Sequence, residues 1–445
     1  MTEVLFIAFQ FPPINIAGSI RPYMFAKYLP SFGIKPIILT LDPYNQKDYK
    51  VDSNNKLIDQ LTSEIKVYTA PIKKKNTSSI EKFNQIYLSI GDDKYKRWKK
   101  NALIQIEEIL KKNNIKAIYF TAPPFNNGNL AVKTSKKYKI PLILDMRDGW
   151  SKWCIAPYAS VLHYHFTKKR EAFFFKNSTY IVTVTNVLKN VFLATHSNLE
   201  SNKIEVIPNG FDINDDEIPT LLSSNVTSTS KKIKIGYIGT FYYNPSAEES
   251  LNSSWWQRKS YRWFQYFPTH EKWVYRSPFF FLKTVAELIK EHPNYKSKIE
   301  FIFIGNIEPW LLKMVNDLGL TSNFENRGFI EHIHLEEVTK DINFFLSTSV
   351  KVEEGKDYAI ASKTFDYIKF KKPILAFVTA GSQKSFIENS NTGITFDPDD
   401  LKTNTRKLKN ILEHECSLNV NKNYLKGFTR KNITKQLSEL IYKAI

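Results

Sequence analysis

The sequence predicts an α/β protein of two doubly wound domains, each a parallel sheet covered by helices on both faces. Short apolar runs, rich in β-branched and aromatic residues, alternate with helical patterns in both halves of the 445 residues. Runs of this kind are typical of strands that are buried on both faces. A polar stretch separates the halves, and at roughly 100–200 residues per domain the length suits two or three domains.

Seven apolar runs in the first half are expected strands. Helical patterns lie between several of them, which indicates β–α–β units. The expected strands are Val4–Phe9, Pro36–Leu41, Ile65–Ala70, Ile115–Phe120, Pro141–Met146, Tyr180–Thr185 and Ile204–Ile207.

The second half begins the same pattern again. Its expected strands are Ile233–Ile238, Ile299–Ile304, Ile342–Leu346 and Pro373–Val378. Its expected helices are Ser277–Lys290, Pro309–Leu318, Ser362–Phe370 and Leu401–Leu412.

These patterns give the domain boundaries. We expect an N-terminal domain at 1–211, a linker or surface loop at 212–232, which contains SSNVTSTSKK, and a C-terminal domain at 233–421. An aromatic and basic insertion at 250–276 belongs to the C-terminal domain. Residues 422–445 are expected to form C-terminal helices, for which packing back on the N-terminal domain is one option.

Composition limits the classes of protein. Two cysteines cannot form a disulfide framework, which favours a reducing compartment. The start MTEVLFIAF is interpreted as a buried strand, not as a signal peptide, and no apolar run approaches the ~20 residues of a spanning helix. We therefore expect a cytoplasmic protein, at most peripheral at the inner face of the cell membrane.

With 63 Lys and Arg against 44 Asp and Glu, the formal charge of +19 attracts anions such as nucleic acid, anionic lipid or phosphorylated substrates.

The loop after the first strand is a candidate ligand-binding loop. Pro12 and Pro13 end the strand, and Gly18 lies where the next helix opens. Glycine lets the backbone approach a ligand, and the free N–H groups of a helix N-terminus favour anions. Arg21, one turn into the helix, suits a phosphate. The alternative is an ordinary strand–helix turn with a surface arginine, because the spacing is not that of a known nucleotide loop.

A second candidate is the stretch LILDMRDGWSKW. Asp145 ends a very apolar strand, and Arg147 and Asp148 follow at once. The carboxyl ends of strands are where open α/β sheets place functional groups. The alternative is structural, with Asp148 capping a helix and Arg147 paired with Asp145.

The C-terminal domain has its candidate ligand site around Ser362. Gly239 follows the first strand of this domain and allows close backbone approach. Ser362 is a candidate N-cap, and Lys363 adds positive charge beside the amides that would hold a diphosphate. Asp366 shares their helix face and suits the hydroxyls of a ribose. The alternative is a capped surface helix with an incidental acid.

No metal site is predicted. His163 with His165, and His332 with His334, are spaced for one strand face, but no carboxylate or cysteine is spaced with them as in a zinc site. The Asp-x-Asp within residues 397–400 precedes a helix and is interpreted as a cap.

The segment Trp255–Arg276 holds four of the eight tryptophans, interleaved with Arg and Lys. One interpretation is an insertion whose aromatic side chains pack on the domain. A second is a contact surface for a lipid-linked acceptor or a membrane. A third is stacking with nucleic-acid bases, for which the remaining sequence gives no support.

Five stretches occur in a characteristic order. They are FPP…AGSIRPYMFAKYLPSFG, LDMRDGWS, VIPNGFD, GYIGTFY with FIFIG, and ASKTFDYIKFKKPILA. Together they resemble glycosyltransferase family 4, whose GT-B fold has two Rossmann-like domains facing across a cleft. The resemblance covers most of the chain. It implies transfer of a sugar from a UDP- or GDP-sugar by the retaining reaction that is usual in the family, with neither a metal nor another cofactor.

The resemblance also implies roles for the candidate residues. The cleft-lining, catalytic candidates of the first domain are Asp145, Arg147 and Asp148. Candidates for binding the nucleotide-sugar donor are Gly18, Arg21, Gly239, Ser362, Lys363 and Asp366, with Gly18 and Arg21 at the phosphates or near the acceptor. The implied partners are a nucleotide sugar and a glycan or lipid-linked glycan of surface polysaccharide biosynthesis, with peripheral contact to an anionic membrane and no nucleic acid.

The sequence departs from the family pattern in three places. Asp366 takes the place of a glutamate, and the position of its usual acidic partner is Tyr358, with Glu353 and Glu354 nearby. The first-domain histidine has no obvious counterpart, Asn129 being nearest, and the Arg…Lys pair expected after GTFY is unclear. A GT-B nucleotide-sugar epimerase and a non-catalytic scaffold that binds a nucleotide sugar or a partner protein therefore stay open as alternatives. A nucleic-acid-binding protein is suggested by charge alone.

Overall fold

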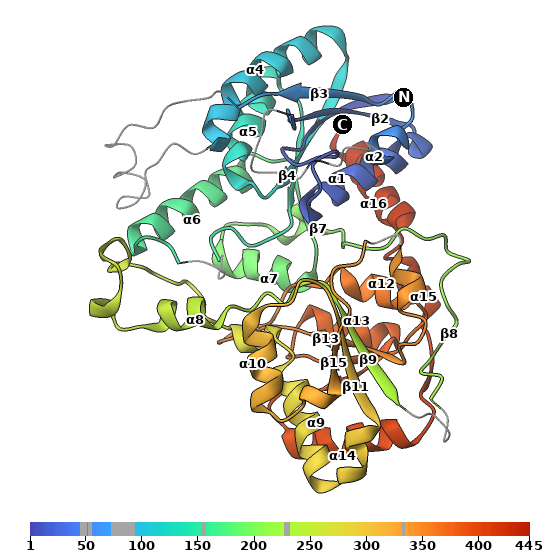
Figure 1. Ribbon diagram of the computed structural model, residues 1–445. Helices are drawn as coiled ribbons and strands as arrows, with labels where there is room; N and C mark the ends of the chain where they lie inside the picture. The colour runs from blue at the N-terminus through green and yellow to red at the C-terminus, as the bar shows by residue number, and fades with distance from the viewer. Residues whose placement is uncertain (45–50, 52–55, 73–93, 153–156, 227–231, 332–333) are drawn as a thin grey trace. The chain divides into compact units, whose positions relative to one another are not determined.

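The computed structural model describes residues 1–44, 51, 56–72, 94–152, 157–226, 232–331 and 334–445 (Figure 1). Contacts between residues divide the chain into two compact units. Unit 1 comprises Met1–Asp212, Trp255–Pro268 and Arg430–Ile445, and unit 2 comprises Ile213–Ser254 and Thr269–Thr429.

Unit 1 contains a parallel sheet with the strand order β3-β2-β1-β4-β5-β6-β7. Each of the seven expected strands is present, because nearly continuous apolar runs satisfy a strand that is covered on both faces. The order reverses between β1 and β4, where ligands bind in open sheets of this class. The strands are β1 (Thr2–Ile7), β2 (Ile34–Leu41), β3 (Lys66–Ala70), β4 (Ile115–Ala122), β5 (Leu142–Met146), β6 (Tyr180–Thr183) and β7 (Ile204–Val206).

Helices from both ends of the chain cover the sheet of unit 1. The C-terminal helix α16 buries Ile433, Leu437 and Ile441 in the same core cluster as α1 and the strands. Their i, i+4, i+8 spacing gives α16 one apolar stripe. Figure 1 shows α16 in red beside α1 in blue. The longer helices of the unit are α1 (Ala17–Tyr28), α4 (Lys94–Lys112), α5 (Gly128–Tyr138), α6 (Val161–Lys176), α7 (Asn186–Thr195) and α16 (Arg430–Ala444).

Unit 2 repeats the architecture with a parallel sheet in the order β12-β11-β9-β13-β15-β16. The four expected strands form its centre, and the two edge strands were not predicted. The strands are β9 (Ile233–Ile238), β11 (Ile299–Ile304), β12 (Phe324–Asn326), β13 (Phe344–Thr348), β15 (Ile374–Phe377) and β16 (Gly393–Phe396). The helices include α8 (Pro245–Asn252), α9 (Phe279–Glu291), α10 (Pro309–Asp317), α12 (Lys363–Lys369), α13 (Ser382–Ser390), α14 (Leu401–Glu413) and α15 (Lys422–Lys426).

The units differ from the expected boundaries in three places. Of the expected C-terminal segment 422–445, only Arg430–Ile445 groups with unit 1, while α15 stays in unit 2. The stretch expected as a linker contains β8 (Leu221–Ser223), which pairs with β17 (Ser417–Asn419) in unit 2. Within the insertion expected in the C-terminal domain, Trp255–Pro268 groups with unit 1. The physical reason is a backbone pairing between Tyr158 and Tyr266, with both N–H···O distances at 2.9 Å.

Within the described part of the chain, no helix combines the length and the apolar character that crossing a bilayer requires.

The docking of α16 gives a test of the fold. Replacing Leu437 with Ala leaves a cavity in the core of unit 1, so we expect a loss of about 2–5 kcal/mol in the free energy of unfolding, measured in urea. Lys435→Ala, at an exposed position of the same helix, serves as the control and should change that free energy by less than about 0.5 kcal/mol. Equal stability of the two variants would show that α16 is not part of this core.

Candidate functional site

A buried ion pair joins the first two candidate stretches in unit 1. The Arg21 guanidinium on α1 binds the Asp145 carboxylate of β5 in a bidentate manner, with Nε–Oδ2 and Nη2–Oδ1 distances of 3.0 Å. The side chains are 2% and 0% exposed. Tyr119 and Thr121 of β4 also donate to Asp145 Oδ2. Burial, followed by the charge of Asp145, raises the pKa of the Tyr119 hydroxyl well above its ordinary value, so this hydroxyl stays a donor.

The remaining donors of Arg21 hold the VIPNGFD turn. Its Nη2 donates to the Ile207 carbonyl at 2.8 Å, and Nη1 donates to the Pro208 carbonyl at 2.8 Å and to Asn209 Oδ1 at 3.3 Å. A guanidinium has five N–H donors, and five acceptors surround this one. Arg21 was expected to contact a phosphate and Asp145 to be catalytic, and the structure instead places both in contacts within the fold. Both side chains are fully buried, and their contacts join α1, β5 and the turn at residues 207–209.

Arg147 and Gly18 also have structural contacts. Arg147 donates to the carbonyls of Gly18 at 2.8 Å, Ala122 at 3.1 Å and Pro123 at 2.8 Å, and not to Asp145 as the alternative proposed. A Cβ atom at Gly18 would lie 2.1 Å from the Gln10 side chain. A side chain at position 18 would therefore displace the end of Gln10, and Arg147 fixes this loop to the end of β4.

Asp148 is partly exposed to solvent, whereas the other candidate carboxylate of unit 1, Asp145, is buried.

The loop that contains Asp148 is held by Glu171 of α6, a residue that the sequence analysis missed. The Glu171 carboxylate is fully buried and accepts from the backbone N–H groups of Trp150 and Ser151, both at 3.1 Å, and from the Ser151 hydroxyl. His196 Nε2 lies 2.7 Å from Glu171 Oε2. The one available signal was a single acid in the basic and aromatic segment FTKKREAFFFK.

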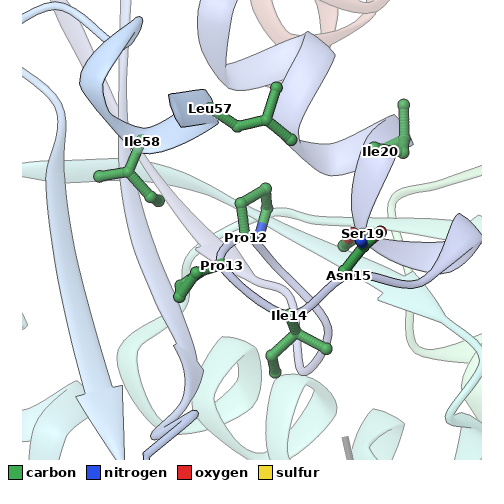
Figure 2. Close-up of a pocket in the computed structure, with 8 residues that line it drawn as sticks. All are labelled: Pro12, Pro13, Ile14, Asn15, Ser19, Ile20, Leu57 and Ile58. Atoms are coloured by element: carbon green, nitrogen blue, oxygen red, sulfur yellow. The ribbon is translucent and has the colours of Figure 1, made fainter. Parts of the chain in front are cut away.

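A cavity of about 160 Å³ opens beside the loop after β1. Figure 2 shows Pro12 and Pro13 in its middle, with Leu57 and Ile58 reaching over it. Six of the eight lining residues are apolar, so the cavity suits an apolar group or the face of a ring. The lining residues are Pro12, Pro13, Ile14, Asn15, Ser19, Ile20, Leu57 and Ile58.

In unit 2, the candidate site is centred on Lys363 at the start of α12. Its Nζ donates to the Tyr237 hydroxyl at 2.5 Å and lies 3.8 Å from the centroid of the Tyr237 ring. The Thr240 carbonyl is 3.4 Å away. No carboxylate in the described part of the chain forms an ion pair with this ammonium. Burial, opposed by the charge of Asp366, lowers the pKa of Lys363 to about 7.

Two glycines shape the space next to Lys363. Gly239 ends β9 with φ at +86°, and a Cβ atom there would lie 3.8 Å from Lys363 Nζ. A Cβ atom at Gly305, which follows β11, would lie 2.9 Å from the Gly239 carbonyl oxygen. The carboxyl ends of these neighbouring strands and the Lys363 ammonium therefore come together with little side-chain bulk between them.

The other candidates in unit 2 lie on the same helix. Ser362 occupies the N-cap position and is exposed, but its side chain makes no capping hydrogen bond, so that part of the expectation was wrong. Asp366 is partly buried within the first turn. Tyr367 accepts from the Ile238 N–H at 3.2 Å and stacks on Phe345 at 4.2 Å between centroids, which fixes α12 against β9 and β13.

Two further residues of this region were missed from the sequence. Gln383 of α13 accepts from the Ala361 N–H at 2.8 Å and donates to Thr364 Oγ1 at 2.7 Å, so it positions the segment that enters α12. Asp357 is buried beside Tyr358, and burial raises the pKa of its carboxyl to about 6. A carboxyl therefore exists one position from the place where the family pattern has its first acid.

Among the described residues, no group of His, Cys, Asp or Glu is arranged to hold a metal ion. His332 lies outside the described residues. Asp400 accepts from the Thr403 N–H at 3.0 Å at the start of α14, which confirms its interpretation as a cap.

The Arg21–Asp145 pair yields a test that separates a structural from a catalytic role. Asp145→Asn leaves a buried guanidinium without its counter-charge, so we expect a loss of about 3–5 kcal/mol in the free energy of unfolding, measured in urea. Asp148→Asn, three residues further on and partly exposed, should lose less than about 1 kcal/mol. If Asp145→Asn kept wild-type stability but lost enzymatic turnover, the catalytic interpretation would be restored.

Comparison with known proteins agrees with this architecture. Residues 22–215 match the sequence model of Glycosyltransferase Family 4. No curated protein matches the chain. The solved structure of a glycosyltransferase from Rickettsia africae is similar with a TM-score of 0.57 and 15% identity, over 100% of this chain and 98% of that one.

Two further solved structures share the fold. The lipopolysaccharide outer core galactosyltransferase WaaB is similar with a TM-score of 0.57 and 11% identity, over 100% of both chains. The UDP-GlcNAc 2-epimerase from Neisseria meningitidis, solved with UDP-GlcNAc bound, is similar with a TM-score of 0.50 and 13% identity, over 99% of this chain and 100% of that one. Residues 22–215 therefore match Glycosyltransferase Family 4, and the chain has the GT-B fold with two Rossmann-like units.

Proposed function

We propose that the protein is a glycosyltransferase that transfers a sugar from a UDP- or GDP-sugar to a glycan or lipid-linked glycan. The observation that supports this function most strongly is the Lys363 ammonium, which is partly buried at the carboxyl edge of the sheet of unit 2 and forms no ion pair with a carboxylate among the described residues. A buried charge without a counter-charge is unfavourable, and a bound anion removes that penalty. A nucleoside diphosphate is the anion that a glycosyltransferase of this fold requires.

The geometry around Lys363 suits a diphosphate. Gly239 and Gly305 leave the ends of β9 and β11 accessible to a ligand. The sequence has no Lys or Arg from residue 239 to residue 257, where the family usually supplies a basic pair. We propose that Lys363 provides this positive charge from α12 instead.

We assign the nucleoside end of the donor to Asp366. This carboxylate lies three residues after Lys363, so the two side chains leave the helix on neighbouring sides. A carboxylate at this place is suited to accept hydrogen bonds from ribose hydroxyls. Asp357 precedes Asp366 in the chain and has a buried carboxyl group. We propose that it takes the place of the missing glutamate.

The proposed reaction is a substitution at the anomeric carbon. The bond from this carbon to the diphosphate oxygen breaks, a bond to the acceptor oxygen forms, and the acceptor proton leaves with the diphosphate. Protonated Lys363 stabilises the negative charge that develops on the leaving group. We propose retention of configuration and no metal or other cofactor, as the family resemblance implies.

On the acceptor side, unit 1 offers Asp148 as the carboxylate with solvent access, in place of the buried Asp145. The cavity beside Pro12 and Pro13 suits a sugar face or an apolar carrier. The similarity to a lipopolysaccharide galactosyltransferase is consistent with a surface polysaccharide as the product. We propose a cytoplasmic enzyme that works at the inner face of the cell membrane.

An epimerase is the second candidate, because the Neisseria epimerase shares the fold and binds a nucleotide sugar. A non-catalytic nucleotide-sugar scaffold is the third candidate, because the side chains of Arg21 and Asp145 bind each other in a buried ion pair and are not available to a substrate.

One assay separates the three functions. Acceptor-dependent release of UDP or GDP from a panel of nucleotide sugars indicates transfer, interconversion of two nucleotide sugars indicates epimerisation, and binding with neither indicates a scaffold.

The Lys363 site predicts the outcome for a matched pair of variants. Lys363→Met removes a charged hydrogen bond to the donor diphosphate, so we expect at least tenfold weaker binding of the preferred nucleotide sugar in calorimetry, in line with about 1.5–3 kcal/mol for such a bond. Lys369→Met, at an exposed position of the same helix, should bind within twofold of wild type. Unchanged affinity in Lys363→Met would remove the basis of the proposed donor site.

A further inference from the structure

Helix α6 of unit 1 has apolar side chains on its exposed face as well as on its buried face. Tyr164, Phe174 and Phe175 are buried, as expected for a helix packed on a sheet. Leu162 is 80% exposed and Phe166 is 62% exposed, one helical turn apart. A surface helix normally places polar residues on the face opposite its apolar stripe. Solvent alone therefore does not explain the composition of this helix.

The insertion Trp255–Pro268 adds exposed aromatic side chains to the same unit. Trp256 is 66% exposed and Phe264 is 77% exposed. Trp255 lies against Trp256 and Trp263, with ring centroids 6.0 and 6.3 Å apart, so these indoles form one cluster instead of packing into the core. Exposed apolar patches on a folded domain usually mark a binding surface.

The insertion is attached to the beginning of α6. Tyr158 and Tyr266 pair through two backbone hydrogen bonds of 2.9 Å, and the Tyr164 ring lies 5.1 Å from the Tyr266 ring. Figure 1 shows the insertion next to one end of α6. We call the exposed side chains of these two segments the aromatic–basic surface. It consists of Val161, Leu162, Phe166 and Phe173 of α6 and Trp255, Trp256, Trp263 and Phe264 of the insertion.

The charges around this surface are of one sign. The insertion Trp255–Pro268 contains three cations, Arg258, Lys259 and Arg262, and no acid. Helix α6 contains four Lys or Arg residues, and its one acid, Glu171, is fully buried. Aromatic rings with Lys and Arg are the combination that binds at the boundary between lipid head groups and acyl chains. Exposed carboxylates, which an anionic lipid surface repels, are absent from these two described segments.

We propose that the aromatic–basic surface binds the head-group region of an anionic lipid bilayer. The indole and phenyl rings enter the interface, and the Lys and Arg side chains contact lipid phosphates. This proposal goes beyond the donor site and uses none of its residues. It makes unit 1 the membrane-bound part of the protein.

Flotation with lipid vesicles tests the proposal. The wild-type chain should bind vesicles of equal phosphatidylglycerol and phosphatidylcholine at least tenfold more tightly than vesicles of phosphatidylcholine alone. Binding should weaken in 0.5 M salt, because screening reduces the attraction between exposed charges. The double variant Trp256→Ser/Phe264→Ser should bind the anionic vesicles at least tenfold more weakly, and Leu162→Ser/Phe166→Ser should show the same loss.

Matched controls identify the other outcomes. Phe329→Ser removes a ring of unit 2 that is 71% exposed and should leave vesicle binding unchanged. The two double variants and Phe329→Ser should keep the wild-type melting temperature, since their altered side chains are exposed. Lys363→Met should bind vesicles as tightly as the wild type, whether or not the donor site is assigned correctly. Wild-type vesicle binding by both double variants, or no binding by the wild type, would overturn the proposal. A wild-type dimer that becomes monomeric in the double variants would assign the surface to a second copy of the chain instead.

Discussion

The account depends on one lysine amine, that of Lys363, which forms no ion pair with a carboxylate among the described residues. Lys363 lies at the ends of two parallel strands, its ammonium on the face of Tyr237 and its hydrogen bonds directed to a hydroxyl and a carbonyl. These neutral groups orient the amine but do not neutralise it, and burial consequently lowers its pKa to about 7. A site of this kind gains most from a ligand that brings two negative charges.

Arg21 of unit 1 differs from Lys363, because its charge is balanced by a carboxylate, that of Asp145. Its guanidinium is surrounded by a carboxylate, two carbonyls and a side-chain amide, and it is 2% exposed. It joins α1, β5 and the turn after β7 into one rigid edge of the sheet. Arg21 therefore has a structural role, whereas Lys363 is a candidate for binding a ligand.

Much of the fold was predictable from the sequence because parallel strands covered on both faces must be apolar. The strands that escaped prediction, β12 and β16, are short edge strands with the sequences FEN and GITF, which carry little apolar signal. The sequence also indicated that Asp145 and Arg147 lie at a strand end and that Lys363 lies at the start of a helix. It did not indicate which acceptor each cation meets, since Arg21 and Asp145 are 124 residues apart and their pairing depends on tertiary packing. Glu171 was missed for the same reason, because its partners Ser151 and His196 lie 20 and 25 residues away in the chain.

The most direct test of the central claim counts protons during donor binding. Because burial lowers the pKa of Lys363 to about 7, its amine is mostly neutral at pH 8, and a bound diphosphate favours the charged form. Calorimetry at pH 8 in two buffers of different ionisation enthalpy, with the tightest-binding nucleotide sugar, should therefore show uptake of about 0.9 proton, and affinity should fall as pH rises above 7. Lys363→Met should abolish this uptake. Donor binding without proton uptake, or equal uptake by the variant, would contradict the account.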